Sequence, residues 1–179
     1  MAKRGKKGKS YSAKKLAVCA MLAALGVVLL SLGALISVMD ISMAVIASLL
    51  CIVAVIEYGG SAPWMVYLVT SLISLFFFPT TPALFYAVFF GYYPILKEKF
   101  EKKPMVISWL FKEITFNAAL ALAGVATVYG FLGIDNELVN PIYIGVVVLL
   151  AQIVFVLYDI ALTRLISIYL ISLRKRFKF

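Results

Sequence analysis

The stretch Trp109-Leu-Phe-Lys112-Glu113-Ile-Thr-Phe-Asn117 decides the fold, because it places charged and polar side chains inside a long apolar run. The run begins after Pro104 and continues to Leu132. Ionisable side chains in a membrane are costly and face a bundle interior or a wet cavity. We therefore expect the other helices to shelter this stretch, together with a second polar set, Gln152 and Asp159.

The composition excludes an ordinary water-soluble domain. The chain has 179 residues, of which 64% are hydrophobic and only 14% are charged. Soluble domains carry roughly 25% charged residues. Too little polar surface remains to cover a soluble globule of this size, so the composition predicts an integral membrane protein. Cys19 and Cys51 lie in apolar runs and are interpreted as small buried hydrophobes.

The net charge of +9 is concentrated at the ends of the apolar runs. Basic residues fill the tail 1–15, the segment 97–103 and the tail 174–179. A basic tail can indicate nucleic-acid binding. Here all three clusters flank apolar runs, so we interpret them by the positive-inside rule and expect no nucleic-acid partner.

Six apolar runs predict an all-α bundle of six transmembrane helices, because helices satisfy their own backbone groups in lipid. The transmembrane domain is expected to cover residues 16–173, between the two basic tails. With both termini in the cytoplasm, every basic cluster falls on the cytoplasmic side. Pro94 is expected to kink or end the fourth run before a loop at 97–103. The protein is predicted to be a multi-pass protein of the plasma membrane, and its high Lys, Phe and Tyr content with no His favours a bacterial one. The predicted spans are 16–38, 41–56, 62–78, 83–96, 105–132 and 142–173.

The polar residues of the last two runs fall at matching depths when counted from the basic ends. Glu113 and Arg164 each lie about 15 Å in, so they are expected to meet if the two helices are neighbours. Lys112 either extends to the headgroups or pairs with Asp159. These four residues form a predicted intramembrane charge network.

Two polar stripes give the charge network two possible roles. Asn117 shares a face with Glu113, and Gln152 shares a face with Asp159. Facing stripes of this kind enclose either a tight structural contact or a small polar cavity. The sequence leaves open a structural clamp and a ligand or ion pathway.

Enzyme signatures are missing. The chain has no His, no Gly-x-Ser-x-Gly, no His-Glu-x-x-His and no phosphate loop. Tyr158-Asp159 matches one half of an intramembrane aspartyl protease pair, but the Gly-x-Gly-Asp half is absent. We expect no enzymatic activity, no cofactor and no metal.

The first run carries a different pattern. Ala13 and Ala17, and then Ala20 and Ala24, are spaced four residues apart. Small residues at this spacing allow another helix to approach closely. The partner helix can belong to the same bundle or to another protein.

The first run, Lys15-Leu-Ala17-Val-Cys-Ala20-Met-Leu-Ala23-Ala24-Leu25, and the six-helix architecture resemble the substrate-binding S components of energy-coupling factor transporters. Such proteins bind a vitamin-like molecule from outside and dock onto a membrane coupling subunit driven by two ATPases. The resemblance implies that Ala13, Ala17, Ala20 and Ala24 are docking residues. It places the ligand near Asn117, Tyr129, Tyr143 and Gln152, and we add Asp159 to this set. It assigns no role to Lys112, Glu113 or Arg164.

Two other hypotheses remain. The chain can be a non-transporting scaffold or assembly partner in which the buried charges are structural clamps. It can also be a small proton-coupled carrier that uses Glu113 or Asp159.

Overall fold

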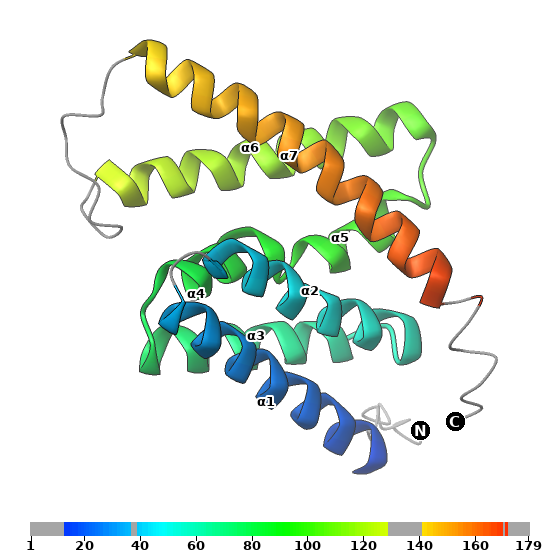
Figure 1. The fold of residues 1–179 in the computed structure, drawn as a ribbon. Helices are drawn as coiled ribbons and strands as arrows, with labels where there is room; N and C mark the ends of the chain where they lie inside the picture. The colour runs from blue at the N-terminus through cyan, green and yellow to red at the C-terminus, as the bar shows by residue number, and fades with distance from the viewer. Residues whose placement is uncertain (1–12, 37–38, 129–140, 170, 172–179) are drawn as a thin grey trace, which may run out of the picture. The chain divides into compact units, whose positions relative to one another are not determined.

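A computed structural model describes residues 13–36, 39–128, 141–169 and 171, and the side chains at 126–128 and 141–143 lie outside the description. Within this part of the chain the structure is all helical apart from short turns (Figure 1). It divides into two compact units, Met1–Leu96 and Lys97–Phe179.

Four helices are long enough and apolar enough to cross a membrane, which fits a membrane protein. They are Ala13–Leu35, Asp40–Glu57, Met105–Val125 and Ile144–Ile168. Their exposed faces carry large apolar side chains, among them Met21, Leu122 and Leu149. Exposed apolar faces of this extent are expected in lipid, because a soluble helix turns a polar face outward.

The first unit begins with three helices: α1 (Ala13–Leu35), α2 (Asp40–Glu57) and α3 (Ala62–Phe77). Helix α1 packs against both others. A side chain at Gly26 would meet Thr70 Cγ2 at 3.0 Å, so glycine lets α1 and α3 approach closely here. Gly59 and Gly60 make the turn between α2 and α3 with φ of 54° and 61°, which glycine adopts without strain.

The fourth apolar run is not the single helix that was predicted over 83–96. It consists of α4 (Thr81–Phe85), the π-helix η2 (Tyr86–Phe90) and α5 (Tyr93–Phe100). The Gly91 N–H donates to Tyr86 O at 2.7 Å, five residues back, as a π-helix requires. Pro94 does not end the run, because it is the second residue of α5, where its missing N–H has no intrahelical partner to lose.

The expected loop at 97–103 is therefore wrong in its first half. Helix α5 continues to Phe100, and only residues 101–104 connect it to α6 (Met105–Val128). Lys97 is a helical residue as a result, one turn before Glu101. Since the first unit ends at Leu96, the last turn of α5 belongs to the second unit.

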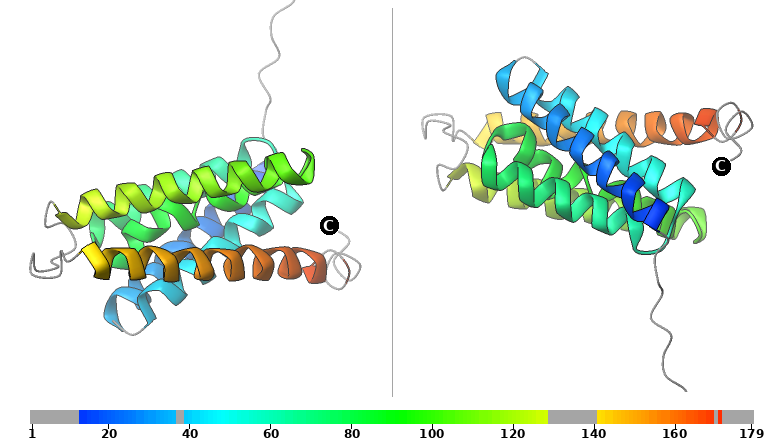
Figure 2. Two further views of the ribbon diagram at one scale, coloured as in Figure 1. Left: turned by 90° about the horizontal axis from the view of Figure 1, so that it is seen from above. Right: turned by 90° about the horizontal axis from the view of Figure 1, so that it is seen from below.

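The second unit contains α6 and α7 (Pro141–Ile168), which run in opposite directions (Figures 1 and 2). Phe116 and Phe155 stack between them, with ring centroids 4.4 Å apart and planes 12° from parallel. Both rings are buried. The predicted ends of these runs at 129–132, 170 and 172–173 lie outside the described residues.

Candidate functional site

The second unit contains a cluster of buried charges built from three helices. Helix α5 supplies Lys97, α6 supplies Lys112 and α7 supplies Asp159. Lys97 is only 1% exposed, Lys112 5% and Asp159 3%. Charged side chains are almost never buried to this extent unless they are paired.

Asp159 divides its two carboxylate oxygens between the two lysines. Lys97 Nζ donates to Oδ1, and Lys112 Nζ donates to Oδ2 at 2.8 Å. Lys97 also contacts Glu101 Oε1 at 2.8 Å and Thr163 Oγ1 at 2.9 Å. Glu101 Oε1 lies 3.5 Å from Lys112 Nζ, so it is a weaker partner of the second lysine.

The charges in this cluster balance. Two ammonium groups face two carboxylates, one buried and one on Glu101, whose side chain is 41% exposed. Taking an ion out of water costs several kcal/mol, and only close, well-oriented partners repay this cost. A balanced cluster is stable as a unit, and removing one member leaves a buried charge without its partner.

The structure pairs two residues of the predicted charge network, Lys112 and Asp159. Of the two alternatives for Lys112, it therefore shows pairing with Asp159 and not extension to the headgroups. It does not join Glu113 to Arg164: no ion pair links them within the described residues. The reason is helical phase. Arg164 lies five residues after Asp159, about 140° around the helix, and is exposed.

The predicted ligand residues Asn117 and Gln152 lie side by side. Gln152 Nε2 donates to Asn117 Oδ1 at 3.3 Å, and Asn117 Nδ2 donates to Glu113 O at 2.9 Å. Asn117 is exposed and Gln152 is half-buried. Tyr129 lies outside the described residues, and so does the side chain of Tyr143.

Sequence reasoning missed three residues of the cluster: Lys97, Glu101 and Thr163. Two signals were present. Lys97 and Glu101 are four residues apart, as a helical ion pair requires. Thr163 lies four residues after Asp159, on the same helical face, and its hydroxyl donates to Asp159 O at 2.9 Å.

The four alanines of α1 lie on its exposed side. Ala13, Ala17, Ala20 and Ala24 are all exposed. The opposite side packs within the first unit through a different set of mostly small residues: Cys19, Ala23, Gly26, Leu30 and Gly33. Internal packing in this unit therefore does not account for the alanine spacing.

A second polar group, unforeseen from the sequence, is buried in the first unit beside η2. The Cys51 thiol and the Tyr86 hydroxyl are 3.2 Å apart. Thr70 Oγ1 donates to Ala23 O at 3.4 Å, and Thr70 is fully buried. Both cysteines are free and buried. These contacts satisfy polar groups in an apolar interior.

No known protein family, characterised protein or solved structure matches this chain. Within the described part of the chain, no three His, Cys, Asp or Glu side chains gather in a way that could hold a metal ion.

Proposed function

We propose that the protein is a membrane-embedded subunit that binds a vitamin-like solute for uptake and works with a separate ATP-driven coupling module. The observation that carries the proposal is the exposed alanine face of α1, formed by Ala13, Ala17, Ala20 and Ala24. The side chains of this alanine face are small, so a helix of a coupling subunit can approach α1 closely.

The proposed topology has six spans with both termini in the cytoplasm. The four long helices supply four of them. Helix α3 has 16 residues, or about 24 Å at 1.5 Å per residue, and needs a locally thinned bilayer to cross. Helix α4, η2 and α5 together supply the remaining span. Lys97 then lies toward the cytoplasmic end, consistent with the positive-inside rule.

The solute is proposed to bind among the outer halves of α6 and α7, near Asn117 and Gln152. These amides present polar atoms on otherwise apolar helices. Gln152 Oε1 is buried and accepts no hydrogen bond from any described residue, so it has an acceptor to offer a ligand. An amide acceptor favours a solute with N–H or O–H groups.

A second candidate is a non-transporting scaffold or assembly partner, and the balanced charge cluster favours it. Lys97, Lys112 and Asp159 satisfy one another, which suits a structural clamp. The same pairing weakens the proton-coupled carrier, because Asp159 would have to release two lysines whenever it took up a proton.

Affinity capture tests the proposal. The tagged protein is purified from its own membranes in mild detergent, and bound proteins and small molecules are identified by mass spectrometry. Recovery of a membrane subunit with paired ATPases, or of a vitamin-sized solute, supports uptake. A clean protein with neither, under conditions that preserve known transporter complexes, favours the scaffold.

A further inference from the structure

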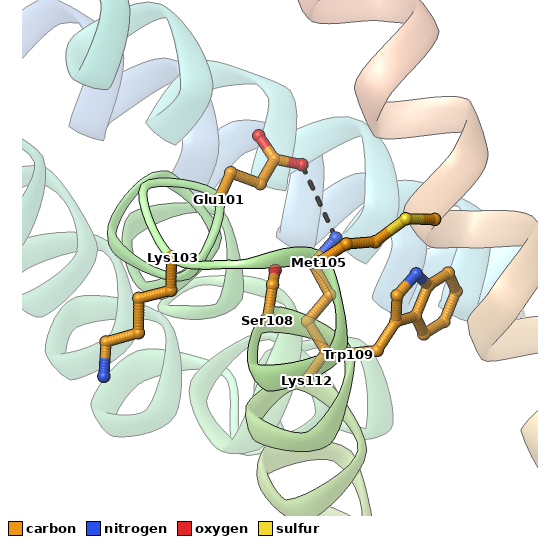
Figure 3. A pocket seen from close by; sticks show the side chains of 6 residues that line it. All are labelled: Glu101, Lys103, Met105, Ser108, Trp109 and Lys112. Carbon is orange, nitrogen blue, oxygen red and sulfur yellow. Dashed lines mark hydrogen bonds and ion pairs between the residues drawn. The ribbon is translucent and has the colours of Figure 1, made fainter.

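A pocket of about 270 Å³ opens at the start of α6, and the uptake proposal does not use it (Figure 3). It lies wholly within the second unit. Charged, hydroxyl and apolar side chains share its wall: Glu101, Lys103, Met105, Ser108, Trp109 and Lys112. A pocket of this composition suits a ligand with one polar end and one apolar end.

Ser108 provides a hydrogen-bond donor that no protein group uses. Its side chain lines the pocket and the residue is only 6% exposed. Its hydroxyl has no hydrogen-bond partner among the described residues. Because Ser108 lines the pocket, its hydroxyl can donate a hydrogen bond to an acceptor of a ligand bound there.

The start of α6 adds backbone donors beside this hydroxyl. Ser108 N donates to Pro104 O at 2.9 Å, which begins the helical ladder. The amide N–H groups of the three preceding helical residues, 105–107, have no carbonyl partner one turn back in the helix. Backbone N–H groups and the helix dipole favour an anion at this end of a 24-residue helix.

Lys112 can serve an anion in the pocket without breaking the charge cluster. Its ammonium has three N–H donors. One is held by Asp159 at 2.8 Å, whereas the Glu101 contact at 3.5 Å is at the limit of a hydrogen bond. If a bound anion displaces Glu101 from Lys112, Glu101 still has its closer partner, Lys97, at 2.8 Å.

Lys103 provides a second positive charge at the edge of the pocket. Its side chain is exposed, and its ammonium lies 4.1 Å from the centre of the Phe111 ring. Figure 3 shows it pointing away from Lys112, so it has to leave the Phe111 ring to reach a ligand in the pocket. The lining carries two lysines and one glutamate, a net charge of +1.

We propose that this pocket binds a phosphate group, as a phospholipid headgroup or as soluble phosphate. A hydroxyl, a helix N-terminus and an ammonium converge on it, and phosphate offers several acceptor oxygens to such a set. Trp109 and Met105 line the pocket beside these donors, where the apolar part of a phospholipid would lie.

Tryptophan fluorescence reports directly on this pocket. The chain has two tryptophans, Trp64 and Trp109. The full-length protein with Trp64→Phe leaves Trp109 as the single reporter. It is titrated in a non-ionic detergent with dihexanoyl phosphatidylglycerol, with inorganic phosphate against chloride at equal ionic strength, and with dihexanoylglycerol. The last compound has the same chains without phosphate.

A saturable change with the phospholipid alone supports a lipid headgroup, and a change with inorganic phosphate as well supports a soluble phosphate ligand. No saturable change with either, or an equal change with dihexanoylglycerol, overturns the proposal.

Matched variants test the residues. Ser108→Ala is expected to weaken binding about tenfold, the loss of one hydrogen bond to a charged group. Lys103→Gln is expected to weaken it about threefold at low salt and less at high salt. Lys102→Gln removes the same charge from the same turn, but Lys102 pairs with Glu98 and does not line the pocket. Equal weakening by Lys102→Gln and Lys103→Gln, with no effect of Ser108→Ala, would show unspecific charge attraction and overturn the site.

Discussion

Asp159→Asn is expected to destabilise the second unit strongly, because Asp159 is the buried anion that Lys97 and Lys112 share. The amide keeps the size and removes the charge. Two ammonium groups then face only Glu101, which is partly exposed and 3.5 Å from Lys112. Removing one partner of a buried ion pair costs about 3–5 kcal/mol. For a chain of this length, that corresponds to a fall in Tm of roughly 6–20 °C.

A second substitution distinguishes this explanation from a general loss of packing. In Asp159→Asn, the unpaired charge is the one on Lys112, because Lys97 retains Glu101 at 2.8 Å. Adding Lys112→Met removes that charge and keeps an apolar stem of similar length. The double variant is therefore expected to be more stable than Asp159→Asn alone.

The free energy of unfolding is measured by titrating SDS into the protein in mild detergent micelles, with helicity followed by circular dichroism. The reasoning is refuted if Asp159→Asn changes this free energy by less than 1 kcal/mol. The reasoning is also refuted if the loss of unfolding free energy in the double variant equals the sum of the losses in Asp159→Asn and Lys112→Met measured separately. Such additivity would mean that the two residues do not interact.

Three further substitutions test the packing and the predicted ligand residues. Gly26→Val is expected to lower stability by about 1–3 kcal/mol, because any Cβ there meets Thr70 at 3.0 Å; an unchanged Tm would contradict the close approach of α1 and α3. Gly124→Ala has open space around it and is expected to raise stability by up to about 1 kcal/mol, so a fall in Tm would show a contact that the structure lacks. Asn117→Ala removes an exposed 3.3 Å hydrogen bond with Gln152, so it is expected to change stability by less than about 0.5 kcal/mol. The same variant is expected to bind the solute more weakly. Binding equal to wild type in a ligand titration would remove Asn117 from the proposed site.

The pairing of Lys112 with Asp159 illustrates what the sequence could predict. Both residues interrupt apolar runs, and a buried charge needs a partner of opposite sign, so the number of possible partners was small. The helical class and the apolar outer faces follow from composition in the same way. These inferences need only the high free-energy cost of placing an unpaired charge in lipid or in a protein interior.

The position of Lys97 shows where such reasoning fails. A lysine near the end of an apolar run, followed by more lysines, has the pattern of a cytoplasmic loop. The decisive feature is that Pro94 begins a helix instead of ending one, which moves Lys97 onto a helical face one turn before Glu101. The π-helix η2 (Tyr86–Phe90) lies between α4 and α5, and short π-helices of this kind are too rare to be expected from a sequence.

The expected Glu113–Arg164 pair failed for a related reason. Depth along a helix can be counted from the sequence, whereas the side of the helix that faces a neighbour depends on packing. The stack of Phe116 on Phe155 faces inward on both helices. Residues displaced by about 100° or more from that face, such as Arg164, remain outside the cluster.

The measurement that tests the central claim most directly is quantitative capture of partner subunits by three forms of the tagged protein: wild type, Ala17→Leu/Ala20→Leu and Ala118→Leu. All three alanines are exposed, but only Ala17 and Ala20 belong to the alanine face of α1. We predict that the double variant recovers at least about tenfold less coupling subunit than wild type, because large side chains prevent close helix approach. Ala118→Leu should recover as much as wild type, with all three proteins equally folded. Equal recovery by the double variant and wild type would contradict docking through α1.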